Sequence, residues 1–192
     1  MSEGQPVATA NLSYDSPGGF YLGGSVTGVD TAHSGPELLG VEGYAGYARR
    51  LASGPTIDLG VTNTRYTRYF SGGSAVDYTE VYAGVIFNHL SSHIRYSPDY
   101  FRNGVSTLYA DLDGVVEPLH GWRLNGHVGL LTQLAGPRPV GKADAHEDWR
   151  IGVSHKIGPI DLQVAWTGSS RDFYAGQQHG DDAFVVGASY IF

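Results

Sequence analysis

Residues 122–130, WRLNGHVGL, decide the fold class. Every second residue in this stretch is apolar or glycine, beginning at Trp122 and ending at Leu130. The residues between them, from Arg123 to Gly129, are polar or glycine. Successive side chains point to opposite faces of a β-strand, so this period of two predicts a strand with one apolar face and one polar face.

The same alternation runs through most of the chain, whereas the i, i+3, i+4 spacing of an amphipathic helix never persists. Segments of about ten alternating residues are typical of strands that cross an outer membrane. We therefore predict an all-β fold, a single antiparallel up-and-down transmembrane β-barrel whose apolar residues face outward. Its eleven strands are expected at residues 7–15, 20–29, 38–51, 56–69, 78–89, 92–97, 105–116, 122–131, 148–156, 160–169 and 183–192.

The composition limits the classes of partner. The chain has 192 residues, enough for one domain (residues 1–192), with a net charge of −7 and no cysteine. Disulfide scaffolds and thiolate metal sites are therefore excluded, and the acidic balance argues against a nucleic-acid partner. No apolar run approaches the roughly 20 residues of a membrane helix. Hydropathy does not separate a soluble barrel from a membrane barrel, because only every second strand residue of the latter meets lipid.

The connections between the expected strands alternate in length. Tight connections are expected at residues 16–19, 52–55, 90–91, 117–121 and 157–159. Longer connections are expected at residues 30–37, 70–77, 98–104, 132–147 and 170–182. Outer-membrane barrels have short turns on the periplasmic side and long loops outside, so this alternation favours a membrane barrel over a soluble one.

An odd number of strands does not close such a barrel, because bacterial single-chain barrels have an even number with antiparallel closure. We expect a twelfth strand, and a signal peptide, upstream of Met1. The last expected strand ends in Tyr190 and Phe192, which resembles the signal read by the outer-membrane barrel assembly machinery.

Several stretches resemble the TorF family of outer-membrane barrels. They are residues 2–6 (SEGQP), 14–15 (YD), 19–23 (GFYLG), 78–84 (YTEVYAG), 96–101 (YSPDYF) and 148–154 (DWRIGVS). The most specific is YSPDYF, and together they span the chain. The resemblance implies an outer-membrane location, a channel role and a further strand before the position of Ser2. It implies no substrate and no catalytic residue.

The polar faces of the strands supply the expected lumen. Its charged side chains are Glu42, Arg50, Asp58, Glu80, Arg95, Asp111, Asp113, Arg123, Arg150, Lys156 and Asp161. Six acidic against five basic residues predict no clear ion selectivity. Counting across the short turns pairs Arg50 with Asp58, Asp113 with Arg123, and Lys156 with Asp161. Each pair contributes about 0.2–1 kcal/mol, either only fixing the register or also forming a constriction.

Aromatic residues near the strand ends are expected to form the girdles at the membrane interface. They are Tyr14, Phe20, Tyr69, Phe70, Trp122 and Trp149.

Other motifs do not amount to a catalytic or metal site. His89 and His93 are four residues apart, but a tight turn separates them, so we expect interface or lumen histidines. His146, Glu147, His179, Asp181 and Asp182 are expected in solvated acidic loops. Residues 136–142, GPRPVGK, lack the Ser or Thr of a phosphate loop and precede no helix. His155 has no serine beside it that would suit a barrel hydrolase. We expect no catalytic residue, metal or cofactor.

The sequence thus predicts a passive outer-membrane channel for small polar solutes or ions. Membrane lipid, the barrel assembly machinery and the solutes are its expected partners, and the oligomeric state is not predicted. Two alternatives stay open. One is a non-conducting structural or binding barrel that makes contacts through its long outer loops. The other is a soluble barrel whose apolar rows face inward around an apolar ligand.

Overall fold

A computed structural model describes residues 7–31, 35–67, 75–101, 103–137, 145–170 and 182–190. Within these ranges the chain forms eleven β-strands and no helix, as the alternation predicts. The strands are β1 (Val7–Asp15), β2 (Phe20–Thr31), β3 (Gly35–Arg50), β4 (Thr56–Tyr66), β5 (Val76–Phe87), β6 (Leu90–Ser97), β7 (Ser106–Leu119), β8 (Trp122–Ala135), β9 (Ala145–Ile157), β10 (Ile160–Ser169) and β11 (Ala183–Tyr190). In the described part of the chain, no helix is long and apolar enough to cross a membrane.

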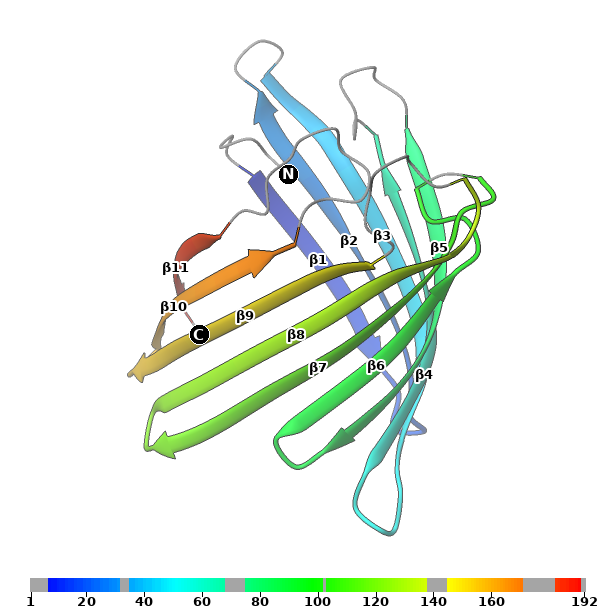
Figure 1. Ribbon diagram of the computed structural model, residues 1–192. Coiled ribbons are helices and arrows are strands. Elements are labelled where there is room, and N and C mark those ends of the chain that lie inside the picture. Colours follow the sequence, from blue (N-terminus) through cyan, green and yellow to red (C-terminus); the bar gives the residue numbers. More distant parts are fainter. Residues whose placement is uncertain are drawn as a thin grey trace.

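All eleven strands form one sheet in sequence order, and each strand is antiparallel to the next. The predicted up-and-down topology is therefore confirmed. The sheet curls, so that β1 to β4 form the rear wall in Figure 1 and β7 to β9 cross in front of them. Hydrogen-bonded pairing of the described residues gives β1 only β2 as a partner, and β11 only β10.

The apolar rows lie on the outside of the curled sheet. Leu12 is 81% exposed and Phe184 is 78% exposed, and they are two of many large apolar side chains left open along the strands. The buried side chains of the described residues include more polar than apolar ones. The polar set is Thr64, Ser97, Thr107, Asp111, Gln133 and Ser154, and the apolar set is Val76, Val105, Leu131 and Ala165. This arrangement contradicts the soluble alternative, in which apolar rows would fill the interior.

Several connections differ from the sequence prediction, and two of them matter most here. Pairing of β2 with β3 continues to Thr31 and Gly35, so the connection spans only residues 32–34 and the expected alternation of short and long connections fails there. The turn between β5 and β6 is Asn88-His89, not Leu90-Ser91, because Leu90 already pairs with Phe87. Asn88 has a φ of 54°, a left-handed conformation that asparagine adopts more readily than most residues.

Glycines make room for aromatic rings on the inner face. The ring of Tyr82 on β5 lies over Gly60 on β4, and the ring of Tyr21 lies over Gly46 in the same way. A β-carbon on Gly60 would stand 2.7 Å from the carbonyl oxygen of Ala45 and would also meet the Tyr82 hydroxyl. These glycines on the polar rows therefore leave the space that the tyrosine rings of the lumen occupy.

We expect Gly60→Ala to lower the free energy of unfolding by about 1–3 kcal/mol, because the added methyl group has no space beside Tyr82 and the β3 backbone. The matched control is Gly43→Ala on the neighbouring strand, where a β-carbon would meet nothing within 4 Å. Urea unfolding in lipid vesicles, followed by tryptophan fluorescence, measures both changes. Equal unfolding midpoints for the two variants would show that the ring does not need the glycine.

Candidate functional site

The inner face of the sheet carries a connected set of polar side chains. Tyr21 on β2 bonds through its hydroxyl to Asp58 on β4 and to Tyr82 on β5. The first contact passes over β3, and the second passes over β3 and β4. Side chains can meet across intervening strands only on the concave face of a curled sheet, so the polar face is the concave one. The alternation that turns the apolar rows outward thus brings polar groups far apart in sequence into contact inside.

The first part of this set, the His93 group, consists of His93, Arg95, Asp111 and Asp58. Asp111 is the buried centre, with a side chain only 3% exposed. It accepts a hydrogen bond from the backbone N–H of His93 at 3.1 Å, lies 3.2 Å from Nδ1 of the same residue, and forms an ion pair with Arg95. Nε2 of His93 lies 3.9 Å from Asp58. Two carboxylates therefore hold one imidazole and one guanidinium.

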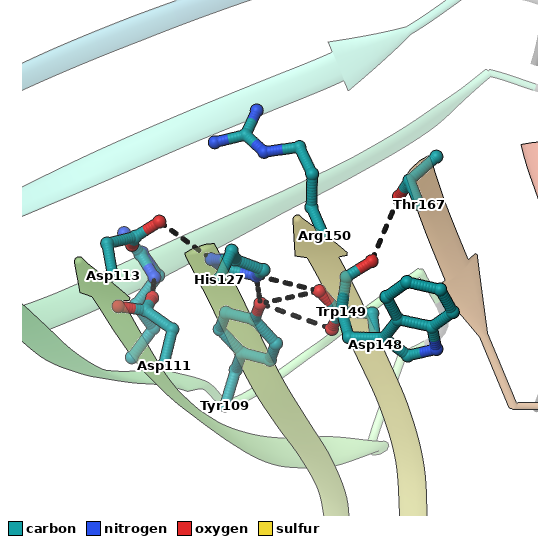
Figure 2. A pocket seen from close by; sticks show the side chains of 9 residues that line it. Tyr109, Asp111, Asp113, His127, Asp148, Trp149, Arg150 and Thr167 are labelled. Carbon is teal, nitrogen blue, oxygen red and sulfur yellow. Dashed lines mark hydrogen bonds and ion pairs between the residues drawn. The ribbon is translucent and has the colours of Figure 1, made fainter. Parts of the chain in front are cut away.

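The second part, the His127 group, consists of Tyr109, Asp113, His127 and Asp148, and Figure 2 shows its contacts. Nδ1 of His127 lies 2.9 Å from Asp113, and Nε2 lies 2.8 Å from Asp148. The Tyr109 hydroxyl is 3.2 Å from Nε2 and donates to Asp148. A protonated imidazole can donate from both nitrogens, so this geometry lets one ring bind two carboxylates at once.

Arg95 joins the two groups and borders two hollows. Its guanidinium carbon lies 5.7 Å from the centre of the Tyr109 ring, within the range of a cation–π contact. One hollow of about 430 Å³ lies beside the His127 group, and Arg150 and Thr167 complete its wall. The other, of about 420 Å³, lies beside the His93 group and is bordered by tyrosines and Asp15. The concave face thus holds open space with a polar, charged lining.

The eleven charged residues predicted for the lumen all lie on this concave face, according to the alternation along each strand and the register between strands. Four of them, Asp58, Arg95, Asp111 and Asp113, belong to the two groups described above. Arg50, Arg123, Lys156 and Asp161 lie apart from these groups, within two residues of the short-turn ends of their strands. Their role in lining a pore stays a prediction.

The predicted ring of ion pairs is wrong at two of its three positions. Arg50 lies opposite Thr56, while Asp58 lies opposite Ala48. Asp113 lies opposite His127 and not Arg123, because β7 continues to Leu119 and the turn is His120-Gly121, not residues 117–121. An irregularity between Val116 and Leu119 also shifts the register by one residue. The third prediction is confirmed for the register, since Lys156 lies opposite Asp161, but Asp161 forms its ion pair with Arg123.

The predicted girdle residues that the structure describes lie on the outer face. Tyr14 and Phe20 are exposed near a short turn. The ring of Trp122 stacks on His155 at 4.2 Å, and Trp149 packs edge-on against Trp166 at 4.5 Å. Tyr190 is exposed at the end of β11. Tyr69, Phe70 and Phe192 lie outside the described residues.

The histidines weighed as metal ligands are dispersed. His89 lies in the turn before β6, whereas His93 lies in the lumen. His146 and Glu147 belong to β9 and not to a loop, because that strand begins at Ala145. Asp182 directly precedes β11, and His179 and Asp181 lie outside the described ranges. Within the described ranges, no three His, Cys, Asp or Glu side chains are grouped so that they could hold a metal ion.

Sequence reasoning missed the residues that connect the site. It did not name Asp15, Tyr21, Tyr82, Tyr109, His127 or Asp148 as lumen residues. The alternation places His127 on the polar face beside Arg123, and Asp148 shares the parity of Arg150. The alternation therefore places both side chains on the polar face, but it does not show which residues on other strands they contact.

A model of the bacterial family Gcw_chp, described as proteins of unknown function, matches residues 1–191. No curated protein matches the sequence. The resemblance to TorF therefore stays a prediction.

Among solved structures, the NanC porin shares 12% identity at a TM-score of 0.67, with 97% of this chain and 93% of that chain covered. The KdgM porin shares 18% identity at a TM-score of 0.56, with 97% and 92% covered. Identities this low show a common barrel fold and nothing more about function.

Proposed function

The chain belongs to the Gcw_chp family of bacterial proteins of unknown function, and from this premise we propose that it is an outer-membrane channel for the passive diffusion of small polar solutes or ions. One observation carries the proposal. The curled sheet turns charged and hydroxyl side chains toward a hollow interior and leaves its apolar rows uncovered outside. Apolar side chains exposed in such numbers need an apolar solvent, and polar groups lining a hollow need water.

The girdle residues support a bilayer as that solvent. Aromatic side chains such as Tyr14, Phe20 and Trp122 favour the membrane–water interface, where an apolar ring can keep its polar tip wet. The barrel fold shared with porins supports the same reading. Lipid of the outer membrane and the barrel assembly machinery, which would read the aromatic end of β11, are the partners that this proposal requires. Membership of the TorF family would agree with it.

The pairing of the described strands is compatible with one further strand between β1 and β11. β1 and β11 run in the same direction, whereas single-chain barrels of the outer membrane close with antiparallel neighbours and an even strand number. A twelfth strand between them would satisfy both edges. Twelve strands enclose a narrower lumen than the 16–18 strands of the large porins, which restricts the proposed solutes to small ones.

The proposed transport involves no chemical step. Diffusion needs only a hydrated lumen narrowed by side chains, so the hydrogen-bonded set around His127 and Tyr109 is assigned to structure and selectivity and not to catalysis.

The protein purified from outer membranes and added to a planar lipid bilayer should give stepwise increases in current. The expected steps are smaller than those of a large porin, because fewer strands and the inward side chains reduce the cross-section. Insertion is checked on the same sample by resistance to urea extraction from vesicles. An inserted protein that gives no current steps would contradict the channel and favour the non-conducting barrel with loop-mediated contacts.

A further inference from the structure

We propose that the channel selects cations, and that the carboxylates around His93 and His127 set this preference. The inference rests on the proposed channel function and names the class of solute that the channel favours. The charges counted from the sequence are nearly balanced, but their placement in the fold is not.

The two hollows are bordered by more acids than bases. Their carboxylates are Asp15, Asp58, Asp111, Asp113 and Asp148, and their permanent cations are Arg95 and Arg150. Even with both His93 and His127 protonated, the acids exceed the cations in this part of the described chain. Two of these carboxylates, Asp15 and Asp148, were not assigned to the lumen from the sequence.

Pairing cancels charges of both signs. Arg95 is bound to the buried Asp111, so these two charges largely cancel each other at close range. Asp113 and Asp148 share the single ring of His127, which can neutralise at most one of them. The Arg150 guanidinium stands apart from the dashed contacts in Figure 2. With His127 neutral, the net charge beside the His127 group is negative, because Asp113 and Asp148 outnumber Arg150. With His127 protonated the charges there balance, and the excess of acid comes from Asp15 and Asp58 beside the His93 group.

Among the described residues, the remaining basic side chains of the concave face lie at one end of the lumen. Arg50 is the last residue of β3, Arg123 is the second of β8, and Lys156 is the last but one of β9. Each lies next to a short turn, and Arg123 is paired with Asp161. Exposed charges separated by more than about 8 Å are largely screened at physiological ionic strength. Arg123 precedes His127 by four residues of strand, roughly 13 Å, so it offsets the acids around His127 only weakly.

Two more carboxylates extend the acidic stretch toward the long connections. Glu42 on β3 lies 3.5 Å from the hydroxyl of Thr64, and Glu80 on β5 lies opposite Thr62. Both point to the concave face. A polar path lined with fixed negative charge concentrates cations and excludes anions, as rings of Asp and Glu do in cation channels. The favoured solutes are small cations, inorganic or organic.

Reversal potentials in a potassium chloride gradient across a planar bilayer test the inference. The native channel should pass potassium more readily than chloride.

The double variant Asp113→Asn/Asp148→Asn should lower the potassium-to-chloride permeability ratio by about twofold or more, because two fixed charges leave the path. Glu42→Gln, outside the His127 group, gives the same sign of change should the double variant fail to fold. The matched control is Asp77→Asn, an exposed carboxylate on the outer face of β5, which should leave the ratio unchanged.

The outcomes separate the two claims. A native ratio at or below one, with clear current steps, overturns cation selectivity and leaves the channel intact. An equal fall for Asp77→Asn and for the lumen variants overturns the assignment to these carboxylates. No current from inserted native protein overturns the channel itself.

Discussion

Replacing Val61 with arginine should cost the barrel about 2–4 kcal/mol of stability in a bilayer, because Val61 lies at the middle of β4 on the apolar outer face. A guanidinium there has no water and no partner, and both neighbours across the strands, Ala45 and Val81, carry no charge. Urea titration of the folded protein in lipid vesicles measures the loss. The yield of folded protein in the outer membrane should fall with it.

Thr62→Arg is the matched control, one residue along the same strand. Thr62 borders the hollow of about 420 Å³ and lies opposite Glu80, so an arginine at this position would have both space and a carboxylate. We expect it to change stability by less than about 1 kcal/mol, since lumen substitutions on such barrels mainly affect selectivity. If Val61→Arg were tolerated as well as Thr62→Arg, the outer face would not be in contact with lipid, and the membrane location would fail.

The strands could be predicted because their signal is local. Each strand needs only a period of two within its own residues, and the pattern of residues 122–130 recurs in β4, β5, β9 and β10. The ends were less accurate. β2 and β3 continue through residues that look like a loop, such as Asp30 and Gly35, because backbone pairing does not depend on the apolar period.

For the site, the sequence predicts only on which face of the sheet each side chain lies, and not which residues it contacts. Parity assigns each charged side chain to one face of the sheet, and the eleven charged residues predicted for the lumen share the concave face, while their role in a pore stays a prediction. Partners depend on register, and the turn at His120-Gly121, shorter than the expected 117–121, together with the irregularity beside Val116 replaced the expected partner of Asp113 with His127. Contacts that skip strands, such as Tyr21 with Tyr82, depend on how tightly the sheet curls, which no short segment of sequence specifies.

Removing Arg95 should have the largest effect of any change inside the lumen. Asp111 has a side chain that is 3% exposed, and Arg95→Ala leaves this carboxylate with His93 as the one partner in the described part of the chain that is able to carry a positive charge. Removing one partner of a buried ion pair costs about 3–5 kcal/mol, because the remaining charge is left uncompensated. The urea midpoint in vesicles measures this loss.

The double variant Arg95→Ala/Asp111→Ala should recover much of the stability lost in Arg95→Ala, since no uncompensated charge stays behind. Arg123→Ala is the matched control, because the side chain of Arg123 is 45% exposed in its ion pair with Asp161 and such pairs contribute at most about 1 kcal/mol.

Arg95 also borders both hollows, so its removal should raise the single-channel current even where stability is restored in the double variant. A larger loss of stability in Arg123→Ala than in Arg95→Ala would mean that the short-turn end, and not the buried Asp111, holds the lumen together. An unchanged current in the double variant would mean that the solute path does not pass Arg95.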